Sequence, residues 1–339
     1  MHDQLSETTS ALLVDGKGIL AMDESTPTCN KRFKSLGIPQ NEEMRRAYRE
    51  MIITTPGLGQ SISGAILFDE TLRESSSSGE SFVKLLIEQG IVPGIKVDKG
   101  TVPLAGHDGE TVTEGLDGLR QRLSEYAQLG AKFAKWRAVI AIDDDLPTAG
   151  AVEANAHALA RYAALCQEVG LVPIVEPEVL MHGHHSILRC GEVTEMVQRE
   201  VFVQLNRQQV TLETMILKPN MVAPALDYEA QTSDAAIADA TVQCLMRTVP
   251  AAVAGIAFLS GGQDPEHATA RLAEMNARYK TTAPWPLTFS FGRAIQRPAL
   301  ECWLGEKANV PAARALLLER AEANAKARCA NTQHEVAKI

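Results

Sequence analysis

Short apolar runs recur along the whole chain and alternate with longer segments of mixed polarity. Each run is almost continuously hydrophobic up to its last residues, which is typical of a parallel strand covered by helices on both faces. The eight runs are GILAMDES (18–25), GAILFDET (64–71), VPGIKVDKG (92–100), FAKWRAVI (133–140), LVPIVEPE (171–178), TMILKPN (214–220), GIAFLSGG (255–262) and PLTFSFGR (286–293).

The segments between the runs have helical spacing and are rich in alanine, as Ala151–Val169 and His267–Arg278 illustrate. Eight strand and helix units favour a closed (β/α)8 TIM barrel over an open doubly wound sheet, which usually has fewer strands. No composition break or Gly/Pro/Ser linker divides the 339 residues. We therefore predict a single α/β barrel domain over residues 1–339.

The C-terminal segment, which begins NVPAARALLLERAEANAKAR, adds an element to the repeating pattern. Its alanine-rich spacing predicts an extra C-terminal helix, and residues 331–339 are polar and predicted to be a frayed tail.

Composition and charge narrow the classes of function. Hydrophobic residues make up 45% and charged residues 22% of the chain, as in a globular protein with a large core. The formal net charge of -9 argues against a general nucleic-acid or membrane surface, and any anion must be bound in a local cationic pocket. The N-terminus has no basic flank of a secretory signal, and no apolar stretch reaches the length of a membrane span.

The spacing of the cysteines is typical of a cytoplasmic protein. The six cysteines are scattered and have no CxxC spacing, so we expect reduced thiols in the cytoplasm rather than disulfides or a zinc site.

Charged residues close six of the eight apolar runs. Chemistry in a barrel of this kind takes place at the carboxyl ends of the strands, so these charges are expected to meet in one mouth. They are Asp23, Lys96, Lys135, Arg137, Glu176, Glu178, Lys218 and Arg293.

Lys218 is the strongest candidate for a nucleophile, because it ends an apolar run and is followed by Pro219. A lysine with a pKa of about 10.4 is rarely a free amine at neutral pH unless burial or neighbouring cations, here Lys96 and Lys135, favour the neutral form. A free amine can attack a ketone, and the iminium then serves as an electron sink for breaking the adjacent carbon–carbon bond. Glu176 can shuttle protons, and Asp23 can accept the proton of the cleaved hydroxyl. The alternative is a purely structural buried salt bridge between Lys218 and Glu176.

The last two runs carry a second signal, for an anion. FLSGGQ and FSFGR lie at strand-to-helix turns, where glycine leaves backbone N–H groups accessible. Loops after the seventh and eighth strands are the recurrent phosphate site of this barrel class. The predicted phosphate-binding residues are Ser260, Gly261, Gly262, Ser290, Gly292 and Arg293.

Over nearly its whole length the sequence resembles the class I, Schiff-base fructose-bisphosphate aldolases. The resemblance lies in GILAMDES, AILFDETL, GIKVDKG, VPLAGHDGET, GLDGL, FAKWR, EANAHALARYA, LVPIVEPEVL, LKPNMV, TVPAAVAGIAFLSGGQ and LTFSFGRA. It implies reversible cleavage of fructose 1,6-bisphosphate in glycolysis and gluconeogenesis by a homotetramer that uses no metal and no other cofactor.

The resemblance also implies a role for each matching residue. Lys218 in LKPNM forms the Schiff base, Glu176 in VEPE is the acid and base, Lys135 in KWR assists it, and Asp23 in MDES orients or deprotonates the C4 hydroxyl. The serines, glycines and arginine of the last two runs hold the C1 phosphate. The residues expected at the other end of the sugar are Ser25, Thr28, Lys31, Arg32, Lys96 and Arg137, and Glu178 is grouped with these substrate-binding residues.

Two departures from the family pattern change the expectations. The frequent DESTGS is DESTPTCNKR here, so Pro27 is expected to stiffen a loop, while Thr28 still offers a hydroxyl. Animal members end in a tyrosine, whereas the last tyrosine here is Tyr279, so a tail function is not expected.

Three other interpretations are consistent with parts of the sequence. A Schiff-base aldolase can prefer another substrate, such as a sugar 1-phosphate or a seven-carbon bisphosphate. A metal-dependent aldolase has its best support in MHGHHS, with His182, His184 and His185, although such a cluster is more often a polar loop. A non-enzymatic scaffold is the third, but it gives the full set of lysines and carboxylates no role.

Overall fold

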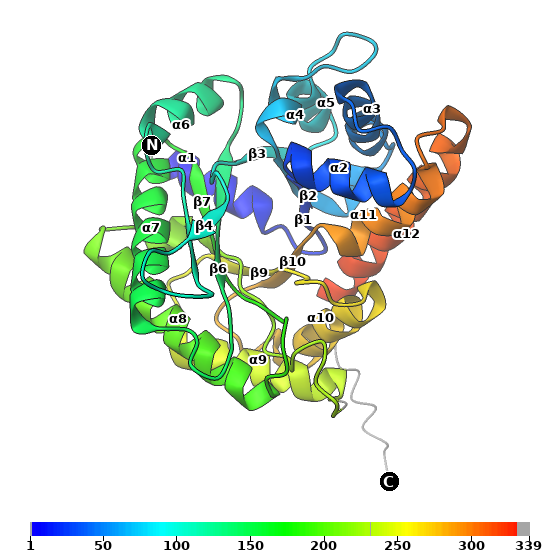
Figure 1. Cartoon of the computed structure of the whole chain (residues 1–339). Helices are drawn as coiled ribbons and strands as arrows, with labels where there is room; N and C mark the ends of the chain where they lie inside the picture. The colour runs from blue at the N-terminus through cyan, green and yellow to red at the C-terminus, as the bar shows by residue number, and fades with distance from the viewer. Residues whose placement is uncertain (1, 231, 331–339) are drawn as a thin grey trace.

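The computed structural model describes residues 2–230 and 232–330, which form a barrel of parallel strands surrounded by helices (Figure 1). The strands close in the order β1-β10-β9-β8-β7-β6-β3-β2, so the predicted TIM barrel is confirmed. Each predicted run supplies one strand: β1 Gly18–Met22, β2 Ile62–Leu67, β3 Val92–Lys96, β6 Phe133–Ile140, β7 Val172–Val179, β8 Ile216–Leu217, β9 Gly255–Phe258 and β10 Leu287–Phe291.

Helices cover the outside of the barrel. The predicted helical segments Ala151–Val169 and His267–Arg278 fall within α7 and α10, and the extra C-terminal helix is α12, which packs against α10 and α11. Predicted tail residues 331–339 lie outside the described part of the chain. The helices are α1 His2–Leu12, α2 Thr26–Ser35, α3 Glu42–Ile53, α4 Asp69–Arg73, α5 Phe82–Glu88, α6 Leu119–Gln128, α7 Ala149–Glu168, α8 Ile187–Arg207, α9 Asp234–Thr248, α10 Pro265–Tyr279, α11 Arg293–Trp303 and α12 Val310–Arg328.

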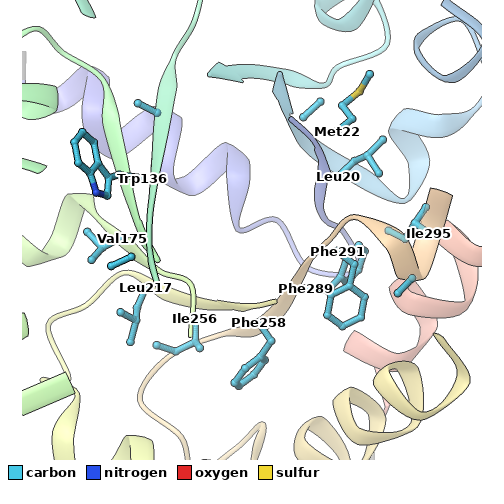
Figure 2. Packing of buried hydrophobic residues seen from close by; sticks show 14 of the residues in the cluster. Leu20, Met22, Trp136, Val175, Leu217, Ile256, Phe258, Phe289, Phe291 and Ile295 are labelled. Atoms are coloured by element: carbon cyan, nitrogen blue, oxygen red, sulfur yellow. The ribbon is translucent and has the colours of Figure 1, made fainter. Parts of the chain in front are cut away.

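The apolar residues of the strands divide between two faces. Outward-facing residues such as Leu20, Val175 and Leu217 join the large core between strands and helices (Figure 2). Their alternates Ile174 and Ile216 belong to a smaller cluster inside the barrel. Because side chains alternate along a strand, residues two positions beyond an inner apolar residue also face inward, at the strand end.

Helix α1 closes the opposite end of the barrel. Its Leu5 and Leu12 pack in the inner cluster with Phe133 from β6. A side chain at Gly64 or Gly94 would overlap the Phe133 ring or Leu12, so these two glycines make room for the inner layer. The apolar side chains fill the barrel on this side and leave the carboxyl ends of the strands as the open mouth.

Some elements interrupt the regular alternation. An antiparallel hairpin, β4 Thr101–Pro103 with β5 Thr111–Thr113, is inserted between β3 and β6. Its strands have three residues each, so it has no apolar run from which it could be predicted. Short 3₁₀ turns occur at η1 Leu58–Gln60, η2 Leu212–Thr214 and η3 Lys307–Asn309. Among the described helices, none combines the length and the apolar character that crossing a membrane requires.

Candidate active site

The carboxyl ends of the strands surround a cavity of about 590 Å³. Sixteen of the predicted site residues line it, so charges from distant parts of the sequence do meet in one mouth. They are Asp23, Ser25, Thr28, Lys31, Arg32, Lys96, Lys135, Arg137, Glu176, Glu178, Lys218, Ser260, Gly261, Ser290, Gly292 and Arg293. Gly262 does not line the cavity but packs behind it, where a Cβ atom would lie 3.2 Å from Arg293 Nη2.

Strand register brings the central residues together. Lys96 pairs in register with Lys135, and the backbone N–H of Lys218 donates to Val175 O at 2.8 Å, which places Lys218 beside Glu176. Lys135, Glu176 and Lys218 each stand two residues after an inner apolar residue. Strand alternation therefore turns all three side chains into the barrel mouth.

The four residues predicted to be catalytic form a chain of alternating charge. Lys135 Nζ lies 2.8 Å from Asp23 Oδ2 and 3.0 Å from Glu176 Oε2, and Lys218 Nζ lies 3.0 Å from Glu176 Oε1. The side chains of Lys135, Glu176 and Lys218 are at most 5% exposed. The predicted ion pair between Lys218 and Glu176 is present, but it lines an open cavity and shares its carboxylate with a second lysine.

The lysines of this group of charges keep the carboxylates of Asp23 and Glu176 ionised. Burial alone raises the pKa of Asp23, but the ammonium groups of Lys135, Lys218 and Lys96 outweigh it and hold that pKa well below its usual range. Burial also opposes ionisation of Glu176, and Lys135 and Lys218 again lower its pKa. For Lys135, burial lowers the pKa, while Asp23 and Glu176 together raise it above the ordinary lysine value. Two anions and a cationic Lys135 therefore face the cavity at neutral pH.

Around the turn after β9 and the start of α11, several hydrogen-bond donors have no partner among the described residues. Gly261 and Gly262 have φ of +58° and +91°, so the backbone takes a path that residues with a Cβ rarely adopt. Ser290 Oγ is buried and has no hydrogen-bond partner among the described residues. Arg293, the first residue of α11, makes no ion pair in the described part of the chain, and burial together with Arg32 lowers its pKa. Free donors at a helix N-terminus suit an anion.

The start of α2 forms the next part of the mouth, because β1 pairs with β10. Ser25 Oγ lies 3.1 Å from Thr28 Oγ1, so both hydroxyls stand together at the cavity. Pro27 was expected to stiffen a loop, and that prediction is wrong, because Pro27 lies in the first turn of α2. A helix does not need the missing N–H at this position, so the proline is accommodated without loss.

Other charged groups of the mouth pair with neighbours that the sequence analysis did not select. Glu24 also lines the cavity and forms ion pairs with Arg32 at 2.5 Å and with Arg49 at 2.8 Å. Asp23 and Glu24 close the same run, but the Glu24 carboxylate turns toward Arg49 on α3. That contact joins distant segments, so no local sequence pattern predicts it. Ser35, Ala21 and Leu259 were likewise missed.

Two more ion pairs lie at the edge of the cavity. Lys96 Nζ lies 2.7 Å from Asp98 Oδ1, and the Arg137 guanidinium donates to the Glu178 carboxylate.

The histidines of MHGHHS do not form a metal site. His182 and His184 are exposed, and among the described residues no three His, Cys, Asp or Glu side chains are grouped so that they can hold a metal ion. All six cysteines are free thiols, as predicted.

Known proteins resemble this chain along almost its full length. The family model for fructose-bisphosphate aldolase class-I matches residues 4–338. A probable fructose-bisphosphate aldolase class 1 of Xylella fastidiosa (strain Temecula1) is 56% identical over 95% of this chain and 96% of its own length. The cytosolic fructose-bisphosphate aldolase 4 of Arabidopsis thaliana is 52% identical over 92% of this chain and 79% of its own length.

A solved structure shares the fold. The fructose-bisphosphate aldolase of Plasmodium falciparum, in a ternary co-crystal with TRAP and a small-molecule inhibitor, superposes with a TM-score of 0.94. The two sequences are 48% identical, and the match covers 96% of this chain and 94% of that one.

Proposed function

This chain belongs to the class I fructose-bisphosphate aldolase family, and we propose that Lys218, Glu176, Lys135 and Asp23 perform its chemistry. As a member of that family it is a lyase of glycolysis that reversibly cleaves fructose 1,6-bisphosphate to dihydroxyacetone phosphate and glyceraldehyde 3-phosphate. The class works through a lysine Schiff base without a metal ion.

The observation that carries the residue assignment is the carboxylate shared between two lysines. Lys218 Nζ passes its ammonium proton to Glu176 and attacks the C2 ketone carbon as the free amine, and the carbonyl oxygen takes up that proton to give a carbinolamine. Glu176, 3.0 Å from Lys218 Nζ, removes the extra proton from nitrogen and returns it to the hydroxyl that leaves as water. Lys135, on the other carboxylate oxygen, stabilises Glu176 in the anionic form between these transfers.

Cleavage uses the far end of the same chain of charges. Asp23, held as an anion by Lys135, takes the proton of the C4 hydroxyl while the C3–C4 bonding electrons move into the iminium. Glyceraldehyde 3-phosphate leaves, and the remaining enamine is protonated at C3. Addition of water to the regenerated iminium then releases dihydroxyacetone phosphate and restores Lys218.

Two groups of donors around the mouth support separate sites for the two substrate phosphates. We propose that the turn after β9, Ser290 and the start of α11 with Arg293 bind the C1 phosphate, because their donors have no partner in the described part of the chain. Ser25, Thr28 and Lys31 at the start of α2 face the other phosphate, together with Arg32, Lys96 and Arg137.

Reductive trapping tests the assignment of the nucleophile. Borohydride, added with dihydroxyacetone phosphate and a chelator, is expected to attach the three-carbon unit to Lys218, and peptide mass mapping locates it. Lys218→Arg keeps the charge but is expected to abolish trapping. An adduct on another lysine, or activity lost to the chelator alone, would overturn the assignment.

We further propose a homotetramer located in the cytosol. The support is the family membership and the word cytosolic in the names of the relatives from Arabidopsis thaliana. Light scattering of the purified protein is expected to give roughly four times the chain mass of 36.7 kDa. The chain mass itself would contradict the tetramer.

A further inference from the structure

A series of polar contacts connects the turn after β9, residues 260–263, to helices α9 and α10. Gln263 ends the turn, and its backbone N–H donates to Ser260 O at 2.9 Å. Its side-chain oxygen Oε1 accepts a hydrogen bond from Arg271 Nη1 at 2.6 Å. Arg271, on α10, also donates from Nε to Asp234 Oδ1 on α9 at 2.8 Å. The turn is therefore tied through one arginine to two helices of the outer layer.

Two residues of the turn 260–263 are glycines. Gly261 and Gly262 carry no side chains, and glycine loses more backbone entropy on ordering than any other residue. Gly262 packs directly against the guanidinium of Arg293, so a shift of the turn displaces both its own N–H groups and its contact with that cation. An anion site is strongest when its donors are ordered before the anion arrives.

The contacts that end at Gln263 are themselves ordered. Gln263 is only 6% exposed, and its Nε2 is buried with no partner among the described residues, so Oε1 is the atom through which its amide is anchored. Asp234 lies in the first turn of α9, where the helix dipole favours a carboxylate. It also accepts from His267 Nδ1 at 3.0 Å. Arg271 is thus held at the Asp234 end and fixes Gln263 at the other.

We propose that Arg271 is a positioning residue for the phosphate of the ketose substrate. Acting through Gln263, it holds residues 260–263 in the conformation that receives the C1 phosphate. This inference rests on the proposed function, because it requires the phosphate to bind at this turn. Arg271 does not line the cavity, so its loss weakens binding of the phosphate and leaves the carbonyl chemistry at Lys218 intact.

The test compares a phosphorylated with an unphosphorylated ketone in borohydride trapping. Arg271→Ala is expected to raise the half-saturating concentration of dihydroxyacetone phosphate about tenfold, the scale of one hydrogen bond to a charged group. The half-saturating concentration of dihydroxyacetone should stay within about twofold, which is under roughly 0.5 kcal/mol. Equal losses on both ketones would show a general structural role and overturn the proposal.

The same helix supplies a matched control. Arg278 on α10 forms an ion pair with Asp239 on α9 at 2.5 Å, so Arg278→Ala also removes an α9–α10 bridge. Arg278 lies about two turns beyond Arg271, further from Gln263, and its loss should change trapping of neither ketone. If Arg278→Ala reproduced the selective loss, the effect would belong to helix packing and the proposal would fail.

A double variant tests whether Arg271 acts through Gln263. Gln263→Ala should give the same selective loss, and adding it to Arg271→Ala should cost nothing more, since both remove one contact. Losses that multiply would contradict the proposed route. Arg271→Lys, which keeps a cation and a donor, is expected to show a smaller loss of the same selectivity, and it replaces the alanine variant if that variant does not fold.

Arg293→Ala, measured in parallel, separates this inference from the proposed function. If Arg293→Ala fails to discriminate between the two ketones, the phosphate assignment itself is wrong. If Arg293→Ala discriminates and Arg271→Ala does not, only the positioning role fails.

Discussion

Replacing Arg293 by alanine is expected to weaken binding of phosphorylated ketones selectively. Arg293 is the cation of the proposed C1 phosphate site and makes no ion pair with any described carboxylate. Its removal therefore leaves no carboxylate of the described chain unpaired. It also takes a positive charge from the first residue of α11, where the helix dipole disfavours cations, so the fold should not lose stability.

The magnitude follows from the contact that disappears. A hydrogen bond to a charged group contributes about 1.5–3 kcal/mol, so kcat/KM for fructose 1,6-bisphosphate should fall by roughly 10 to 150 times. The lower end applies if Ser290 and the backbone N–H groups of the turn keep most of the phosphate contacts. The upper end applies if the guanidinium binds two phosphate oxygens at once.

The assay measures kcat/KM on the bisphosphate and the half-saturating concentrations for trapping dihydroxyacetone phosphate and dihydroxyacetone. Arg297→Ala is a suitable control, because Arg297 lies one turn further along α11 and pairs with Glu301 at the surface. Equal losses on phosphorylated and unphosphorylated ketones, with the control unchanged, would refute the assignment of the C1 phosphate to the start of α11.

Three further predictions concern proton transfer, the C-terminus and stability. The Glu176→Gln variant should bind the substrate phosphate normally but slow both iminium formation and turnover, since an amide cannot shuttle protons. Loss of folding with unchanged turnover per folded molecule would instead favour a structural ion pair with Lys218. Deleting residues 331–339 should keep cleavage and enamine proton exchange within about threefold, or roughly 0.7 kcal/mol, because Glu176 and Lys135, the proton donors that we propose for the enamine, lie in the mouth. A hundredfold fall in exchange would contradict this. Glu74 has two buried carboxylate oxygens without a described partner, and burial, with Glu70 and Glu42, raises its pKa to about 7. Glu74→Gln should therefore increase the free energy of unfolding by about 1–2 kcal/mol at pH 8, after discounting for partial exposure, and by nothing below about pH 4, where the carboxyl is protonated in both states. Urea unfolding at the two pH values measures the difference, and a gain that did not change with pH would contradict the assigned cause.

The local sequence pattern was sufficient to predict the barrel strands and which of their side chains face inward. An apolar run such as the one that ends at Lys218 predicts a strand because both of its faces must be covered, and all eight runs are strands. Alternation then places Lys135, Glu176 and Lys218 on the same inward side as the apolar residues two positions before them. The hairpin of β4 and β5 lacked such a run and was missed.

The pairing of the charges was decided by tertiary structure. The sequence alone determined which titratable groups stand at the strand ends, because burial of the neighbouring apolar residues sets strand position and facing. It could not determine that Lys135 lies between Asp23 and Glu176, because these residues belong to different strands and meet only through barrel closure and register. The same holds for Arg271, whose contact with Gln263 depends on how α10 packs beside the turn that precedes it. Local preferences act over a few residues, whereas hydrogen-bond distances of about 3 Å between remote segments exist only once the whole barrel has closed.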